Sequence, residues 1–134
     1  MFSYDNESVK ERVCDFRKFS KVTQSEMAEY LGMKRTAYQH HEADGNFTWE
    51  QIELLADFFN TSPIFLRYGA DDDDLRSLSK MLKSGKATAF KQPTFTIFDD
   101  VNRKVEELSD YTLFLCMDEI HRNRITKYII DNDL

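Results

Sequence analysis

The stretch Thr23–Glu42, TQSEMAEYLGMKRTAYQHHE, decides how the first half of the chain folds. Thr23 and Glu26 have the spacing of a capping box, which predicts a short helix that begins at this point. Gly32 can adopt the left-handed backbone conformation that ends such a helix. After a turn of about three residues, a second helix is expected over residues 34–43, ending before a second glycine. The stretch therefore predicts two short helices joined by a tight turn.

Similar signals predict three more helices between residues 1 and 70. Ser8 and Glu11 have capping-box spacing before one helix, and Thr48 and Gln51 have it before another. Ser62 followed by proline predicts the start of a fifth helix, which ends at Gly69. The large apolar residues expected to pack in this half include Trp49, Phe58, Phe59 and Phe65.

The second half, residues 71–134, has a different pattern. The run Asp71–Asp74 is expected to be a linker, followed by a helix over residues 75–84. An apolar stripe of Phe98, Val101, Val105 and Leu108 predicts an amphipathic helix. Residues 111–117 fit both a helix and a strand, and a helix is expected from Ile120 towards the end. The predicted architecture is all-α, with a five-helix domain over residues 1–70 and a helical region over residues 71–134.

Composition narrows the class of protein. The chain has 134 residues with 41% hydrophobic and 31% charged, typical of a water-soluble domain. We expect neither a membrane span nor a secretory signal, and two cysteines without a local motif favour the cytoplasm. The net charge of −6 argues against a protein that binds nucleic acid through charge alone.

Residues 6–69 resemble the lambda-repressor-like helix-turn-helix family, of the Cro and repressor (XRE-like) type. Three segments carry the resemblance: TQSEMAEYLGM from Thr23, the pair Arg17 and Glu42, and LADFFNTSPIFLRYG from Leu55. In that family a small residue such as Ala28 lies where the two helices cross. The resemblance also implies a structural ion pair between Arg17 and Glu42, which ties the first helix to the third.

The resemblance implies double-stranded DNA as the ligand. Gln24 matches the family position that contacts phosphate and orients the third helix. Base-reading positions fall on Arg35, Thr36 and either Gln39 or His40. An arginine suits this role because it can hydrogen-bond guanine O6 and N7 together. Lys34, at the mouth of the same helix, would hold a phosphate.

Enzymatic and metal chemistry find little support in the sequence. It contains no glycine-rich phosphate loop and no plausible Ser-His-Asp arrangement. His40 and His41 are adjacent on a helix and point about 100° apart, so they cannot share a metal. We expect partial burial of His41, burial of Cys14 and Cys116, and no cofactor.

The charges of the first half motivate alternatives to DNA binding. Residues 1–70 carry eight cations and eleven anions, a net charge of −3, and the loop 43–48 has no cation. Few phosphate contacts mean weaker binding. One alternative is a protein-binding module on the same fold, such as an anti-repressor or an inhibitor of a host factor. Another is the antitoxin of a toxin–antitoxin pair.

The sequence favours a transcriptional regulator similar to phage or prophage repressors, which blocks a promoter at a palindromic operator. One domain contacts few base pairs, so tight binding requires two linked copies. The apolar residues of the second half exceed what this half can bury by itself. We therefore expect homodimerisation through residues 71–134.

Overall fold

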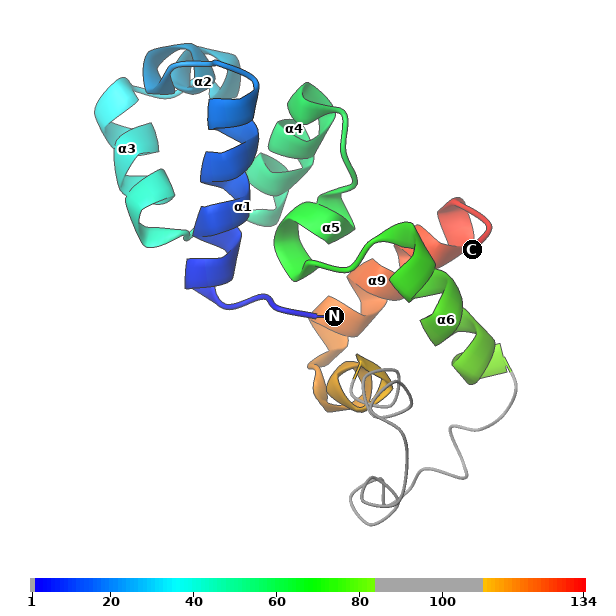
Figure 1. The fold of residues 1–134 in the computed structure, drawn as a ribbon. Coiled ribbons are helices and arrows are strands. Elements are labelled where there is room, and N and C mark those ends of the chain that lie inside the picture. Colours follow the sequence, from blue (N-terminus) through cyan, green and yellow to red (C-terminus); the bar gives the residue numbers. More distant parts are fainter. Residues whose placement is uncertain (1, 84–109) are drawn as a thin grey trace. The chain divides into compact units, whose positions relative to one another are not determined.

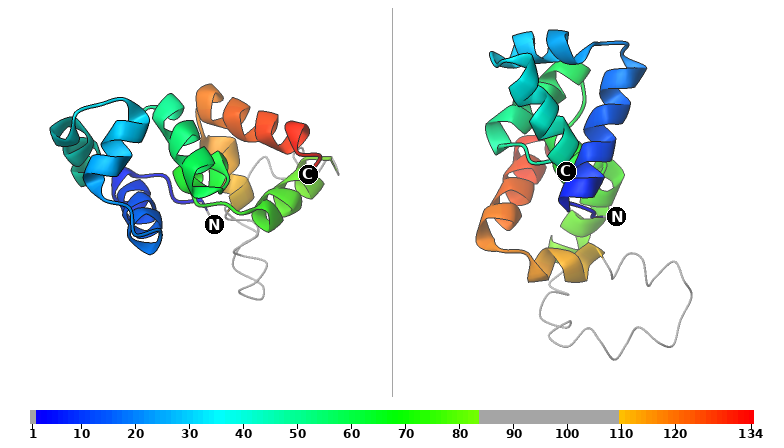
Figure 2. Two further views of the ribbon diagram at one scale, coloured as in Figure 1. Left: turned by 90° about the horizontal axis from the view of Figure 1, so that it is seen from above. Right: turned by 90° about the vertical axis from the view of Figure 1, so that its left-hand side faces the viewer.

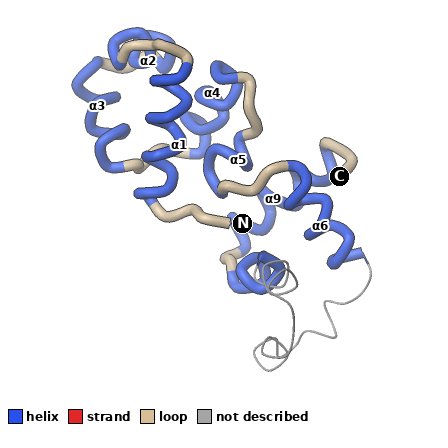
Figure 3. The backbone as a smooth tube through the Cα atoms, in the orientation of Figure 1, coloured by secondary structure: helices blue, strands red, loops and turns tan. Residues whose placement is uncertain are grey.

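The computed structural model describes residues 2–83 and 110–134, and within these ranges it contains α-helices and no strand (Figures 1 and 3). The chain divides into two units, Ser3–Gly69 and Ala70–Leu134 with Met1–Phe2. The all-α prediction is confirmed for the described residues. The division lies between Gly69 and Ala70, one residue before the predicted boundary between residues 70 and 71.

The Ser3–Gly69 unit contains five helices, as predicted: α1 (Asn6–Phe19), α2 (Gln24–Leu31), α3 (Arg35–Asp44), α4 (Trp49–Phe59) and α5 (Pro63–Tyr68). Helix α1 lies beside α3, α4 and α5, and α2 packs against α3 and α4 (Figures 1 and 2). The connections are three to four residues long, so neighbouring helices are fixed by short turns.

Local capping sets where most of these helices begin. The predicted capping boxes of Thr23 with Glu26 and of Thr48 with Gln51 are both present, and Ser62 caps α5 ahead of Pro63. The predicted cap at Ser8 is wrong: the carboxylate of Asp5 accepts hydrogen bonds from the amide and hydroxyl of Ser8. Asp5 is a strong N-cap residue in its own right, so α1 begins at Asn6, three residues earlier than predicted.

The core of this unit lies between its five helices. It consists of Val9, Val13, Met27, Ala28, Tyr38, Phe47, Ile52, Leu55, Ala56 and Leu66. Phe59 and Trp49 pack against it and are partly buried, as is Phe65. The prediction that Phe58 belongs to the core is wrong, because its side chain is 39% exposed. The buried face of α4 is formed by Ile52, Leu55 and Ala56, and Phe58 lies on another side of that helix.

The side chain of Arg12 links the two ends of the Ser3–Gly69 unit. Its guanidinium donates to the carbonyl oxygens of Leu66 and Arg67 and to the hydroxyl of Ser3. The amide of Ser3 also donates to the carbonyl oxygen of Tyr68, at 2.8 Å. These bonds attach the segment before α1 to the end of α5, although the two lie more than 60 residues apart.

The second unit contains α6 (Asp72–Lys83), a helical segment at residues 110–116 and α9 (Glu119–Asp131). The predicted linker Asp71–Asp74 instead begins α6, because the side chains of Asp71 and Asp74 accept each other's backbone amides. Residues 111–116 are helical, which decides between the two alternatives. The stripe from Phe98 to Leu108 lies outside the described residues.

Helices α6 and α9 pack against each other in this unit. Leu75 and Leu78 of α6 are buried, as are Ile125 and Ile129 of α9. The hydroxyl of Tyr128 donates to Asp72, at 3.0 Å. None of the helices in residues 2–83 and 110–134 has both the length and the apolar character needed to cross a membrane.

Two glycines provide a matched test of the packing around α3. Gly32 and Gly45 have φ values of +69° and +68°, but a Cβ at Gly45 would lie 1.9 Å from the carbonyl oxygen of Asn6. A Cβ at Gly32 would meet no atom within 4 Å. Gly32→Ala should therefore lower the free energy of unfolding by only about 1–2 kcal/mol, the cost of the left-handed backbone. Gly45→Ala should cost about 3 kcal/mol or more.

Urea unfolding followed through the emission of Trp49, the single tryptophan, measures both losses. Equal losses for the two variants would contradict the close approach of α3 to the start of α1.

Candidate functional site

Helices α2 and α3 meet through a short turn that the backbone fixes. Gly32 ends α2 in the left-handed conformation, and its amide donates to the carbonyl oxygens of Ala28 and Glu29. The amide of Met33 donates to the carbonyl oxygen of Ala28, at 2.9 Å, and α3 begins two residues later. Ala28 is 2% exposed, so a larger side chain at this position would push the two helices apart. The order and spacing predicted for residues 23–44 are confirmed.

A buried carboxylate connects three helices next to this turn. Glu42 of α3 accepts two hydrogen bonds from the guanidinium of Arg17 at the end of α1, at 2.8 and 2.9 Å. Its Oε1 also accepts from the side-chain amide of Gln24, the first residue of α2, at 3.2 Å. The side chains of Arg17 and Glu42 are 13% and 5% exposed. The predicted ion pair is confirmed, and Gln24 is directed towards α3 by the same carboxylate.

The pKa of Glu42 reflects this environment. Burial by itself raises the pKa, but the hydrogen bonds and charge of Arg17, with the neighbouring Tyr38 and Gln24, outweigh burial and lower the pKa to about 2. The thiol of Cys14 lies on the same side of α1, where burial and the negative charge of Glu42 raise its pKa to about 11. Glu42 is therefore charged at neutral pH, and Cys14 stays a thiol without nucleophilic reactivity.

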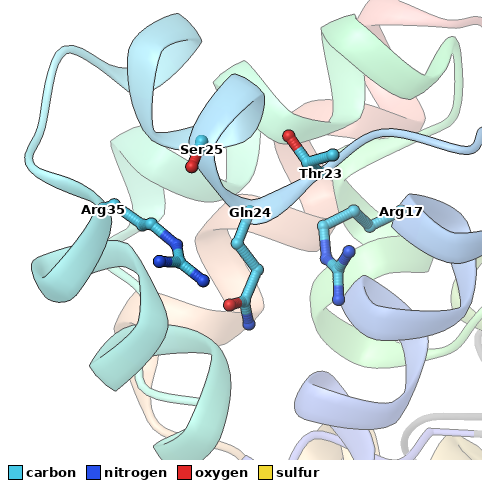
Figure 4. A pocket seen from close by; sticks show the side chains of 5 residues that line it. All are labelled: Arg17, Thr23, Gln24, Ser25 and Arg35. Atoms are coloured by element: carbon cyan, nitrogen blue, oxygen red, sulfur yellow. The ribbon is translucent and has the colours of Figure 1, made fainter.

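An open hollow of about 570 Å³ lies at the start of α2, lined by Arg17, Thr23, Gln24, Ser25 and Arg35. The guanidinium groups of Arg17 and Arg35 lie on either side of the Gln24 side chain (Figure 4). The first amides of a helix have no partner within it and carry a partial positive charge. Two guanidiniums beside a helix N-terminus suit an oxyanion such as phosphate.

The first turn of α3 also suits a negatively charged ligand. Lys34 is its N-cap residue and provides no side-chain cap, and the first turn contains no acidic residue. Uncapped amides at this end are available to an acceptor from outside the protein. Lys34, Arg35, Thr36, Gln39 and His40 are all exposed on this helix.

The structure brings only some of the predicted site residues together. Gln24 and Arg35 line the same hollow, whereas Lys34, Thr36, Gln39 and His40 do not line it. Arg35 and Gln39 are four positions apart on α3, as are Thr36 and His40. Side chains at this spacing lie next to each other on a helix, so Arg35, Thr36, Gln39 and His40 share one side of α3.

Sequence reasoning did not place Arg17 or Ser25 in the hollow. Arg17 was expected only as an internal ion pair, and Ser25 has no signal beyond its place in the first turn of a helix. Exposed Lys18 and Lys21 follow Arg17 at the end of α1. Five cations therefore lie just before the starts of α2 and α3 or within their first residues, in a unit whose net charge is negative.

The remaining histidine and cysteine predictions have mixed outcomes. His41 is partly buried, as expected: its ring stacks on Phe47, and Nδ1 lies 2.7 Å from the carbonyl oxygen of Asn46. The expected burial of Cys116 is wrong, because this side chain is exposed, and Cys14 is only partly buried. Among the described residues, no three histidine, cysteine, aspartate or glutamate side chains gather as a metal site.

No protein-family model, curated protein or solved structure matches this chain.

A double-mutant cycle tests whether Arg17 and Glu42 stabilise the unit as a pair. Arg17→Met or Glu42→Leu alone should lower the free energy of unfolding by up to about 3–5 kcal/mol, because each leaves an uncompensated buried charge. The double variant should recover much of this loss, since both charges are then absent. Urea unfolding monitored by Trp49 emission measures the three differences, and small additive losses would show that the charges do not interact.

Acid titration provides an independent check of the same pair. The pKa of Glu42 is lowered to about 2 from an ordinary value of 4.5, so its stabilising effect is complete above pH 4.5. This effect should decline as the pH falls from about 4.5 to 2, where the folded-state carboxylate takes up a proton. The stability difference between wild type and Glu42→Gln should shrink over that interval. A difference that stays constant with pH would contradict the lowered pKa.

Proposed function

We propose that this chain is a sequence-specific DNA-binding transcriptional regulator, of the phage or prophage repressor type, which binds a palindromic operator as a homodimer. The observation that carries the proposal is the hollow at the start of α2, where Gln24 and two guanidiniums lie beside the exposed first turn of α3. In this proposal α2, its turn and α3 act as a helix-turn-helix element of the lambda-repressor-like family.

In the proposed complex a backbone phosphate occupies the hollow. The first residues of α2 and the guanidinium of Arg17 line it, while Glu42 keeps Arg17 in place through two hydrogen bonds. Helix α3 then enters the major groove with its N-terminal end towards the bases. This places a phosphate contact and the base-reading helix on one rigid unit.

The proposed contacts on α3 follow from side-chain chemistry. Arg35 donates to guanine O6 and N7, and Thr36 offers a hydroxyl and a methyl group. Gln39 or His40, one turn further along, reads a neighbouring base. Lys34 contacts phosphate and contributes affinity without sequence preference.

The distribution of charge supports this orientation despite the acidic total. Lys18, Lys21, Lys34 and Arg35 are exposed, and all lie close in sequence to the starts of α2 and α3. Glu26, in the first turn of α2, is an exception, but its carboxylate already accepts hydrogen bonds from the amide and hydroxyl of Thr23. The other acidic residues of α2 and α4 lie outside this turn. A small positive region is therefore present where the proposed contacts to DNA are made, and the rest of the unit does not attract phosphate.

Selection of bound sequences from random duplex DNA at low salt tests the proposal, and we expect enrichment of a palindromic site. On that site Arg35→Ala should lose about 1–3 kcal/mol of discrimination at one position in each half-site, with an unchanged melting temperature. Lys34→Ala should weaken all DNA about equally and reduce the dependence of log K on log salt by about one.

Lys80→Ala is the matched control, because Lys80 is an exposed cation of α6 in the other unit. It should bind like wild type. The absence of any enriched sequence, or operator binding unchanged in both α3 variants, would refute the DNA-binding proposal.

The homodimer is predicted from the second unit. Ile120 and Ile130 of α9 are 61% and 71% exposed, and a second copy is the simplest way to cover them. The full-length protein should sediment at about twice the mass of the chain. Ile120→Lys with Ile130→Lys should give a monomer with weaker operator binding, because two linked units raise each other's effective concentration.

Asn123→Lys changes an exposed polar residue of the same helix and should remain a dimer. A full-length monomer at tens of micromolar would contradict dimerisation.

A second candidate function is a protein-binding module on the same fold, such as an anti-repressor, an inhibitor of a host factor or an antitoxin. The observation that favours it is the lack of any lysine or arginine on α2 and α4. Failure of the DNA selection together with retention of the fold would favour this candidate.

A further inference from the structure

Helices α2 and α4 present large apolar side chains to solvent. Tyr30 of α2 is 41% exposed, and Leu54 and Phe58 of α4 are 45% and 39% exposed. The rings of Tyr30 and Phe58 lie 4.8 Å apart, and Leu54 is four residues before Phe58 on the same side of α4. The three side chains therefore follow one another across the two helices. We call this surface the α2–α4 face.

The same two helices carry five carboxylates. The five charged residues of α2 and α4 are all acidic and all exposed: Glu26, Glu29, Glu50, Glu53 and Asp57. None of them forms an ion pair with another residue in the part of the chain that the structure describes. The hydroxyl of Tyr30 reaches Asp57 at 3.5 Å, which joins the acidic rim to the apolar centre.

The fold itself does not require this arrangement. The core takes Ile52, Leu55 and Ala56 from α4 and leaves Leu54 and Phe58 outside it. A helix face that only meets water needs no leucine and phenylalanine at a spacing of four. An apolar centre with a polar rim is instead the composition of a surface that binds another protein.

We propose that the α2–α4 face binds an amphipathic helix of a partner protein, in which large apolar side chains at i and i+4 are flanked by lysine or arginine. The apolar side chains of such a helix would pack on Leu54, Phe58 and Tyr30. Its cations would meet the five exposed carboxylates, which favours the encounter and selects against acidic partners.

The charges exclude the other classes of occupant. Nucleic acid and anionic membranes both carry negative charge and would be repelled by five carboxylates. A two-fold contact between two copies of this face would place the same carboxylates opposite one another.

The inference goes beyond the proposed DNA binding and does not rest on it. Tyr30 lies six residues after Gln24 on α2, about 9 Å along the helix axis. The apolar centre of the α2–α4 face uses Tyr30, late in α2, and the exposed side of α4, whereas the hollow uses the first residues of α2 and α3. The apolar centre of the face and the lining of the hollow therefore share no residue.

Selection from a phage-displayed library of randomised helical peptides, with the full-length protein as bait, tests the proposal. Enriched peptides should have a net positive charge with large apolar residues at i and i+4. Their affinity should fall at least tenfold when Leu54→Lys and Phe58→Lys are combined. Glu53→Lys with Asp57→Lys should lower the affinity and weaken its dependence on salt. In NMR titrations of the wild type, the largest amide shifts should fall in α2 and α4.

Phe19→Lys is the matched control, because Phe19 is 89% exposed at the end of α1 and lies outside the α2–α4 face. It should leave peptide affinity unchanged. All changed positions are exposed, and the urea midpoint reported by Trp49 checks that each variant remains folded.

Several results would overturn the proposal. The first is a selection that enriches no peptide. The second is peptide affinity within threefold of wild type for the variant with Leu54→Lys and Phe58→Lys, or an equal loss of peptide affinity in Phe19→Lys. The third is loss of self-association when Leu54 and Phe58 are changed. Operator binding measured on the same proteins separates the two functions. Failed peptide selection with intact operator binding would refute the α2–α4 face alone.

Discussion

The buried carboxylate of Glu42 is the constraint on which the arrangement of the first three helices depends. A charge at 4% exposure is costly unless several donors surround it, and here they come from different elements. Arg17 arrives from the end of α1, and Gln24 arrives from the first residue of α2. Because one carboxylate must satisfy both, the positions of the three helices are specified together. Replacing one partner by an apolar residue would leave the others buried with unsatisfied groups.

This inner network also determines the charge of the outer hollow. Arg17 directs its guanidinium at Glu42 and at the carbonyl oxygen of Val22, so much of its charge is already compensated. Arg35 lines the same hollow and is exposed at the mouth of α3. If Arg35 reads a base, as proposed, a phosphate in the hollow would depend on the start of α2 for most of its attraction. Arg17 is better suited to holding the helices in position than to supplying positive charge to a ligand.

The sequence predicts the Ser3–Gly69 unit well because its helix ends are set by local chemistry. Thr23, Thr48 and Ser62 satisfy the amides of their own helices, and Gly32 needs no distant partner to end α2. The errors arise where a local rule allows two solutions. Asp5 and Ser8 can both cap a helix, and four aspartates can be either a linker or a first turn.

Likewise, only some residues of the candidate site could be predicted from the sequence. Gln24 and Arg35 could be placed by resemblance, because each belongs to a motif of fixed spacing. The position of Arg17 in the hollow and the exposure of Phe58 depend on which helix faces lie against one another. Neither the spacing of apolar residues nor a capping signal contains that information. For the same reason the α2–α4 face is visible only once α2 and α4 are seen to pack together.

The separation of charges within one small unit explains how an acidic protein could bind DNA. At physiological salt an exposed charge is felt over about 8 Å, so carboxylates on the far part of α4 act weakly on a phosphate at the hollow. Lys34 and Arg35, by contrast, would be in direct contact with DNA. With so few cations available, non-specific binding is weak, because it scales with the number of phosphates neutralised. Recognition in such a protein must come from base contacts and from the linkage of two copies, so an acidic surface would favour the operator over bulk DNA.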